Sequence, residues 1–128
     1  MQIIGIDVAK DSLVGVRIDR SGRVKETFTV INNEETIEQF LDTVTKKWKR
    51  IGMGSEATGY YHQALALACL NREIPFRLLN PIITKQFTRA TVRKRKTDLS
   101  DAFVIAKLVM QGEEKECLAQ ANQQSVPQ

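Results

Sequence analysis

The chain has few of the residues that build thiolate metal sites, disulfide frameworks or membrane spans. Its two cysteines, Cys69 and Cys117, lie far apart without CxxC spacing, so we expect neither a zinc site nor a disulfide but two free thiols. Its apolar runs are far shorter than the ~20 residues that cross a bilayer. The N-terminus also lacks a basic segment followed by a long apolar one. We therefore expect a cytoplasmic protein.

The composition is that of an ordinary globular protein. The 128 residues, 42% hydrophobic and 27% charged, suit one folded domain with its own core. After Gly112 the composition turns to Glu, Lys and Gln. We expect a domain over residues 1–112, followed by a polar tail or a truncated continuation over residues 113–128.

Positive charge is concentrated in one segment. No acid occurs between Ile74 and Thr97, whereas the rest of the chain holds 12 bases and 15 acids. This segment holds seven bases: Arg77, Lys85, Arg89, Arg93, Lys94, Arg95 and Lys96. The pattern favours a nucleic-acid-binding surface over its alternative, a solvated basic loop. We expect the contacts to the nucleic-acid backbone to come from Lys85, Arg89, Arg93, Lys94, Arg95 and Lys96.

One carboxylate interrupts the apolar run Gln2–Val8 near its end. The run predicts a central strand covered on both faces. Because burying an unpaired carboxylate costs on the order of several kcal/mol, Asp7 must be neutralised, hydrogen-bonded or held at the strand end beside a cation. In the last case it belongs to a functional site.

The remaining chain reads as alternating sheet and helix, which predicts an α/β fold. Three N-terminal strands form an antiparallel meander, β-α units follow, and the helices pack on a five-stranded mixed sheet. We expect strands over residues 2–8, 12–19, 23–31, 51–56 and 74–79, and helices over about 34–48, 60–71, 82–91 and from 97 onward. Alternation predicts that strand 12–19 is covered on one face only, and the apolar helix 60–71 reads as sandwiched.

Two further acids, Asp98 and Asp101, open the last helix. They are three residues apart, so they share one helix face above the apolar stripe of that helix. An acid at the N-cap followed by another at the third position also resembles a capping box, which needs no metal. Taken alone, the pair favours capping.

The set of four acids changes this interpretation. Asp7 and Glu56 each end an expected strand, and the helix that begins at Asp98 and Asp101 can lie across the same end of the sheet. Four converging carboxylates would repel one another without cations. Mg²⁺ or Mn²⁺ prefers oxygen ligands, and two such ions can serve phosphodiester displacement.

No cluster of His and Cys competes for metal in the sequence. The lone histidine, His62, lies beside Tyr60 and Tyr61 and favours a packing role over metal ligation. The two tyrosines can stack on a base or pack in a core or an interface, and both alternatives stay open.

Five short motifs together resemble a known family. They are Gly5–Lys10, Glu56–Tyr60, Asn80–Pro81, Arg95–Asp98 and Asp101–Ala102. In order and spacing they resemble the N-terminal domain of the DEDD insertion-sequence transposases. These enzymes are related to the pilin-gene invertase and, more remotely, to the RuvC Holliday-junction resolvase. The resemblance spans about residues 2 to 112.

The resemblance implies an RNase H-like, RuvC-like fold in which Asp7, Glu56, Asp98 and Asp101 form a catalytic tetrad that binds Mg²⁺ or Mn²⁺. It implies that DNA is cut and rejoined at element ends and target, in several members under the guidance of an RNA. Family members continue into a second domain with a nucleophilic serine, which has no counterpart here. None of Ser12, Ser21, Ser55, Ser100 and Ser125 is assigned that role. We thus expect a fragment that needs its second domain and further protomers.

Three rival functions remain. A stand-alone resolvase or nuclease would cleave branched or hybrid substrates unaided, and a pure nucleic-acid-binding module would bind with strong salt dependence and without responding to metal. A sugar kinase or actin-like ATPase also begins with an Asp-bearing strand but needs glycine close behind that acid. Here Val8-Ala9-Lys10 follows, and no glycine-rich phosphate loop appears later.

Overall fold

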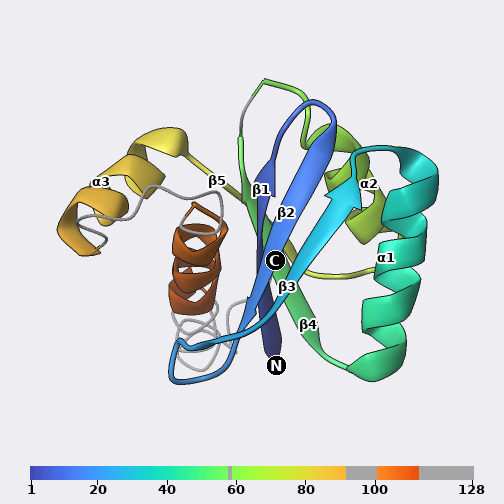
Figure 1. The fold of residues 1–128 in the computed structure, drawn as a ribbon, viewed down its shortest axis with the longest axis horizontal. Helices are drawn as coiled ribbons and strands as arrows, with labels where there is room; N and C mark the ends of the chain where they lie inside the picture. Colours follow the sequence, from blue (N-terminus) through green and yellow to red (C-terminus); the bar gives the residue numbers. More distant parts are fainter. Residues whose placement is uncertain (58, 92–100, 113–128) are drawn as a thin grey trace, which may run out of the picture.

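A computed structural model describes residues 1–57, 59–91 and 101–112. The strands are β1 (Gln2–Val8), β2 (Ser12–Ile18), β3 (Val24–Ile31), β4 (Ile51–Glu56) and β5 (Phe76–Leu79), and the helices are α1 (Glu34–Lys47), α2 (Gln63–Asn71) and α3 (Pro81–Thr91). Residues 101–112 are also helical, and we name them the late helix, drawn in dark orange in Figure 1. None of the helices in the described ranges is long and apolar enough to span a membrane.

The five strands form one mixed sheet in the order β3-β2-β1-β4-β5 (Figure 1). The β1–β2 and β2–β3 pairs are antiparallel, whereas β1–β4 and β4–β5 are parallel. The central position of β1, the antiparallel meander and the mixed α/β fold are therefore confirmed. The carboxyl ends of β1, β4 and β5 all lie at one end of the sheet, which we name the rim.

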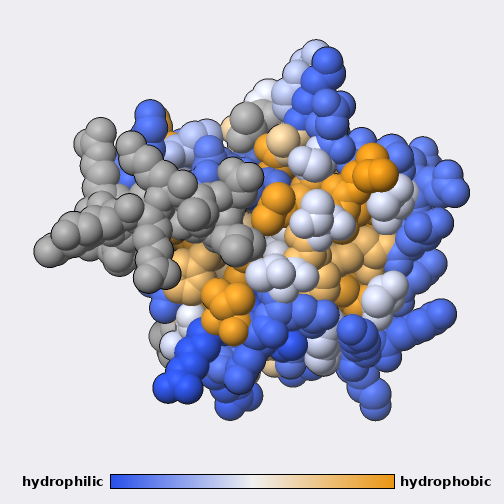
Figure 2. All heavy atoms as spheres, in the orientation of Figure 1, coloured by the Kyte–Doolittle hydropathy of each residue, from blue (hydrophilic) through white to orange (hydrophobic). Residues whose placement is uncertain are grey.

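Helices cover both faces of the sheet. In Figure 1, α1 and α2 lie on one side and the late helix on the other. The first face holds the larger core, built around Ile4, Ile6, Leu13, Leu41, Met53 and Leu65. The second face holds Ile3, Val16, Ile18, Ala102, Ile105, Ala106 and Val109. Figure 2 shows apolar residues in the middle of the visible face and hydrophilic residues around the outline.

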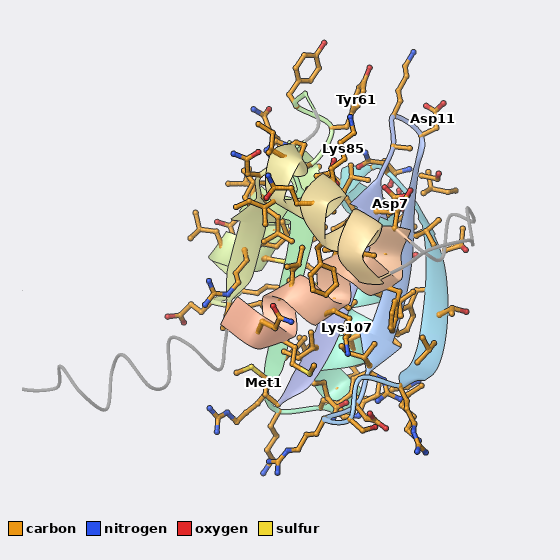
Figure 3. The ribbon with its side chains drawn as sticks, turned by 90° about the vertical axis from the view of Figure 1, so that its left-hand side faces the viewer. Met1, Asp7, Asp11, Tyr61, Lys85 and Lys107 are labelled. Atoms are coloured by element: carbon orange, nitrogen blue, oxygen red, sulfur yellow. The ribbon has the colours of Figure 1, made fainter. Side chains whose placement is uncertain are left out.

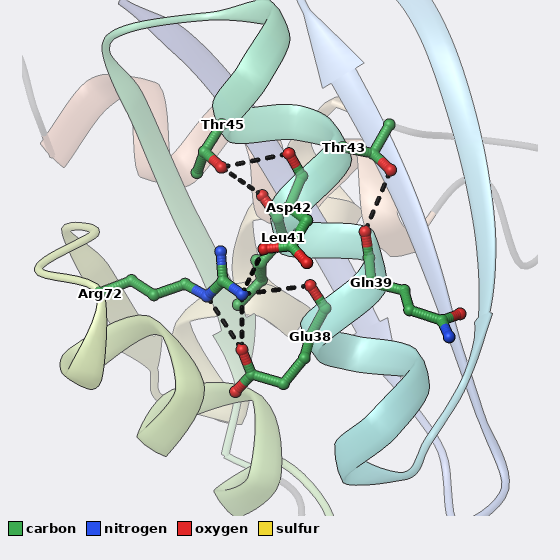
Figure 4. A network of polar contacts seen from close by, with 7 residues as sticks. All are labelled: Glu38, Gln39, Leu41, Asp42, Thr43, Thr45 and Arg72. Atoms are coloured by element: carbon green, nitrogen blue, oxygen red, sulfur yellow. Dashed lines mark hydrogen bonds and ion pairs between the residues drawn. The ribbon is translucent and has the colours of Figure 1, made fainter.

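Helix α1 forms where the sequence signals place it. The Asn33 side chain caps its first turn by accepting a hydrogen bond of 2.8 Å from the Thr36 amide. Its middle turns are tied to the end of α2 by Arg72, whose guanidinium donates to Glu38 at 2.6 Å and to Asp42 at 2.7 Å (Figure 4). These contacts join the two helices on one face of the sheet.

Two predictions about burial are wrong. Strand β2 is covered on both faces, because Leu13 packs under α1 and α2 while Val16 packs under the late helix. Helix α2 is not sandwiched, because α1 packs on one side of it only. Its Leu67 and Leu70 remain 59% and 71% exposed.

Element boundaries also shift. Helix α2 begins at Gln63 rather than Tyr60, because residues 59–62 turn the chain first, with Gly59 at a positive φ of 56°. Strand β5 begins at Phe76 rather than Ile74, since the Ile74 amide still donates a hydrogen bond to the Cys69 carbonyl at the end of α2.

Cys69 is a free thiol, as predicted, and burial raises its pKa to about 12. Cys117 and the predicted tail lie outside the described residues.

Candidate active site

The two strand-end carboxylates are neighbours in the sheet. The parallel register of β1 and β4 ends with Ile6 opposite Ser55, so the next positions are Asp7 and Glu56. Neighbouring strands lie about 4.8 Å apart, and paired residues of parallel strands point to the same face. Both acids therefore share the face that carries Gly5 and Gly54 two residues earlier, which is the face of the late helix.

Two glycines let the late helix approach this face closely. A Cβ added at Gly5 would collide with the backbone of Ala102 and Ala106, and one at Gly54 would collide with the Val109 side chain. The helix therefore lies directly on β1 and β4 where neither strand has a side chain. This contact carries Asp101, one residue before Ala102, toward the rim.

The charge of Asp101 acts on the carboxyl group of Glu56. Burial raises the pKa of Glu56 above its ordinary value, and the negative charge of Asp101 raises it further. A hydrogen bond from the Thr84 hydroxyl and the charge of Lys85 lower the same pKa, by less. The carboxylates thus repel each other, and a bound cation would relieve that repulsion.

Three elements bring three of the four predicted acids to the rim. Asp7 ends β1, Glu56 ends β4, and the exposed Asp101 begins the described part of the late helix. Asp98 lies outside the described residues. Within those ranges, no three side chains of His, Cys, Asp or Glu are grouped closely enough to hold a metal ion by themselves. The donors at the rim are carboxylate oxygens, which fit Mg²⁺ or Mn²⁺.

Two loops frame the rim and are joined by one side chain. The Asn32 amide nitrogen Nδ2 donates to the Ala9 carbonyl at 2.8 Å and to the Tyr61 carbonyl at 3.0 Å. It thereby connects the loop after Asp7 to the loop after Glu56. Figure 3 shows Tyr61 and Asp11 at the same end of the molecule as Asp7, and Met1 at the opposite end.

The tyrosines of this loop do not belong to the core. Tyr60 is 70% exposed and Tyr61 is 38% exposed, with their ring centroids 5.4 Å apart. Of the alternatives left open by the sequence, core packing is therefore excluded for Tyr60. His62 is half-buried at the N-cap position of α2 and makes no capping hydrogen bond.

The predicted nucleic-acid contacts are described only in part. Lys85 is exposed on α3 at the rim end (Figure 3). The side chain of Arg89 and all of Arg93, Lys94, Arg95 and Lys96 lie outside the described residues. Arg77 is half-buried on β5, and its guanidinium lies beside Gly112 of the late helix.

Sequence reasoning missed four residues that shape the rim. Thr84 hydrogen-bonds Glu56, Gly5 and Gly54 admit the late helix, and Asn32 joins the two loops. The two glycines could have been found from the sequence, since each occurs two residues before an acid that ends a strand. No pattern in a single sequence points to the roles of Thr84 and Asn32 at the rim.

Comparisons with solved structures define the class of fold. Thermus thermophilus RuvC matches with a TM-score of 0.63 at 16% identity, over 83% of this chain and 91% of that chain. T. thermophilus RuvC in complex with a Holliday junction substrate also gives 0.63, at 14% identity over 91% and 96%. The large terminase nuclease from thermophilic phage G20c gives 0.54, at 11% identity over 84% and 81%. The fold is therefore RuvC-like, hence RNase H-like, as predicted.

The sequence itself places the chain within that class. The family model DEDD_Tnp_IS110, described as a transposase, matches residues 4–126. The chain belongs to this family, the DEDD transposases of IS110 type, which confirms the resemblance found in the motifs. No curated protein matches the chain.

Proposed function

We propose that residues 1–112 form the metal-binding catalytic domain of an insertion-sequence transposase, which cuts and rejoins DNA phosphodiesters together with a second domain. The observation that carries this proposal is the placement of Asp7 beside Glu56 under the late helix, which brings Asp101 to the same rim. Family membership supports the reaction class, because the match extends over residues 4–126.

The rim acids would hold the metal. Asp7, Glu56 and Asp101 would bind Mg²⁺ or Mn²⁺ together with Asp98, as a site for two ions. When bound, such ions stabilise the attacking and leaving oxygens of a phosphodiester displacement. Thr84 hydrogen-bonds the Glu56 carboxylate, and the raised pKa of Glu56 means that protons compete with metal more strongly there than at an ordinary glutamate.

The basic segment would hold the nucleic acid. Lys85 stands at the rim, and in our proposal Arg89, Arg93, Lys94, Arg95 and Lys96 continue the backbone contacts. The exposed Tyr60 and Tyr61 offer aromatic faces to an unpaired base at the same end. DNA is the proposed substrate, and a guide RNA and further protomers belong to the proposal for the full-length protein.

Replacing the carboxylates tests the proposal. In the full-length protein, Asp7→Asn or Asp101→Asn should lower recombination at least about a hundredfold, since each removes a charged ligand from the metal site. Mn²⁺ binding by calorimetry should be lost while the melting temperature stays within a few degrees. Asp11→Asn is the matched control, because Asp11 is an exposed acid in the β1–β2 turn at the same end. Normal recombination by Asp7→Asn would refute the metal assignment.

A second candidate is favoured by the coverage of the structural match. The chain spans 96% of the RuvC chain that was solved with a Holliday junction substrate, so little of that fold is missing here. As a stand-alone resolvase, the domain would cut four-way DNA junctions without a partner domain. Incubation with such junctions and Mn²⁺ decides between the two: cleavage at paired symmetric positions supports the resolvase, and intact junctions support the transposase domain.

A further inference from the structure

A cavity opens at the end of the sheet opposite the rim. It measures about 440 Å³ and lies between the end of α1, the start of β4 and the segment that follows α2. Its walls include Trp48, Lys49, Arg50, Arg72, Ile74 and Pro75. Asp7 is five positions along β1 from Gln2, or roughly 16 Å at ~3.3 Å per residue. The cavity is therefore separate from the carboxylates, as Met1 and Asp7 in Figure 3 illustrate.

Unpaired positive charge surrounds this cavity. Four of the five residues 46–50 are basic, and Lys46, Lys49 and Arg50 are exposed without an ion pair to any described residue. Lys47 instead lies 3.6 Å from Glu26. Figure 2 shows hydrophilic side chains along the lower edge, where α1 ends in Figure 1. A polyanion would be attracted here, independently of the rim.

Arg72 forms a fixed wall rather than a free charge. Its guanidinium is held by Glu38 and Asp42 at 2.6 and 2.7 Å, so its charge is already compensated (Figure 4). Glu73 is the acidic residue in the lining, and it is exposed. Lys49 and Arg50 are thus two side-chain cations of the cavity lining that no described residue compensates.

The interior of the cavity is suited to a planar apolar group. Trp48, the one tryptophan of the chain, lines it and packs against the larger core, and the Arg17 guanidinium carbon and Lys47 Nζ lie 4.4 Å and 5.6 Å from its ring centroid. Ile51, Ile74 and Pro75 add apolar walls. An aromatic ring and apolar walls beside free cations match the chemistry of an unpaired nucleotide, which stacks its base and offers phosphates to cations. The volume lies within the range of about 300–1,000 Å³ typical of ligand sites.

We propose that this cavity is a second nucleic-acid subsite, which receives an unpaired nucleotide of a single DNA strand while Lys49 and Arg50 contact the flanking phosphates. The choice of DNA rests on the proposed function, whereas the geometry stands without it. A duplex does not enter, because its bases are paired and stacked and cannot leave the helix singly without unpairing. One domain would then hold one DNA segment at the rim and an unpaired strand at the opposite end.

Trp48 makes the test direct, because its fluorescence arises at the cavity and nowhere else in the chain. Titration with an eight-residue oligothymidylate, in low salt and without divalent metal, should quench this fluorescence saturably. The double variant Lys49→Gln/Arg50→Gln should bind at least about fivefold more weakly, and its log–log salt slope should fall by about 1.4, the equivalent of two phosphate contacts to a single strand. Both side chains are exposed, so circular dichroism melting should match the wild type.

The matched control is Lys10→Gln, which removes an exposed base at the rim end and should leave the Trp48 titration within twofold of wild type. Three results would overturn the subsite: no quenching, equal quenching by a duplex of the same length, or an unchanged affinity in the double variant. Tighter binding of oligouridylate would overturn the assignment to DNA. Because metal is absent from this assay, its failure leaves the metal-dependent function of the rim untouched, and failure of the rim variants leaves this assay untouched.

Discussion

The two faces of the sheet differ in the size of the side chains that β1 and β4 present to the helices. Under α1 and α2, strands β1 and β4 present Ile4, Ile6 and Met53, which are fully buried in the larger core. Under the late helix, the same two strands present Gly5 and Gly54 at the points of closest contact. The acids Asp7 and Glu56 belong to the second face. The first face thus supplies most of the apolar burial. On the second face, glycines replace larger residues, so the late helix packs close to the strands and brings Asp101 to the strand ends.

Gly5→Ala should have the largest effect on this arrangement. The added methyl group meets the late-helix backbone, including the Ala106 Cα at 2.7 Å, and backbone moves less readily than a flexible side chain. We expect a loss of about 3 kcal/mol in the free energy of unfolding, the upper part of the range for overpacked cores. Because the helix must shift, Mn²⁺ affinity measured by calorimetry should fall at least tenfold at temperatures where the variant is folded.

Ile4→Ala is the control on the other face, one residue earlier in the same strand. It leaves a cavity in the larger core and should cost about 2–5 kcal/mol in urea unfolding. Its Mn²⁺ affinity should nevertheless stay within twofold of wild type below the unfolding transition. If both variants lost metal binding in proportion to stability, the division of labour between the faces would be wrong.

The sequence predicted the first face better than the second. Periodicity identified α1 with its Ile37, Phe40, Leu41 and Val44 stripe, because a stripe of large apolar residues repeats at the helical period. It also placed Asp7 and Glu56 at strand ends, since aliphatic runs end there. The register that makes these two acids neighbours is a long-range property, which the local pattern does not contain.

What the sequence missed depends on contacts between distant segments. Strand β2 was assigned one covered face because only Val14, Val16 and Ile18 form an apolar stripe. Leu13 on its other face is nevertheless buried under α1 and α2, which lie more than twenty positions further along the chain. Thr84 acts on Glu56 because α3 begins directly after β5, the strand that neighbours β4. The exposed leucines of α2 follow from the absence, in the described residues, of any element packed on its outer side. Such features appear when the chain is assembled in space.

Glu56→Gln should have the opposite effect to the glycine and isoleucine variants, because it should stabilise the metal-free protein. The pKa of Glu56 is raised from 4.5 in the folded state, so the folded state binds this proton more tightly than the unfolded state. The stabilisation that this bound proton gives the folded state is therefore fully present below pH 4.5, and it is lost as the pH rises through the folded-state pKa. Glutamine does not ionise, so the variant should gain up to about 1 kcal/mol over wild type at pH 8, the scale of a partly solvated charge interaction.

Urea unfolding at pH 4 and pH 8 measures this gain, which should be near zero at the lower pH. Mn²⁺ should reverse the order, because it stabilises wild type and not the variant. Glu35→Gln is the control, since Glu35 is exposed in the first turn of α1 and its loss should cost a few tenths of a kcal/mol. A variant at Glu56 less stable than wild type at pH 8 would mean that the carboxylate is not repelled at the rim.

Asn32→Ala should have the smallest effect on Mn²⁺ affinity among the rim variants and only a modest effect on stability. The change removes the hydrogen bonds to the Ala9 and Tyr61 carbonyls, which should cost about 1 kcal/mol in urea unfolding. The loops behind Asp7 and Glu56 are then no longer joined, and Mn²⁺ affinity should fall about threefold. Asn33→Ala is the neighbouring control, because it removes the α1 cap at a similar cost of about 1 kcal/mol without touching either loop. Equal Mn²⁺ affinity in the two variants would show that the strands and the late helix alone position the carboxylates, so the loops contribute nothing to the difference between the two faces.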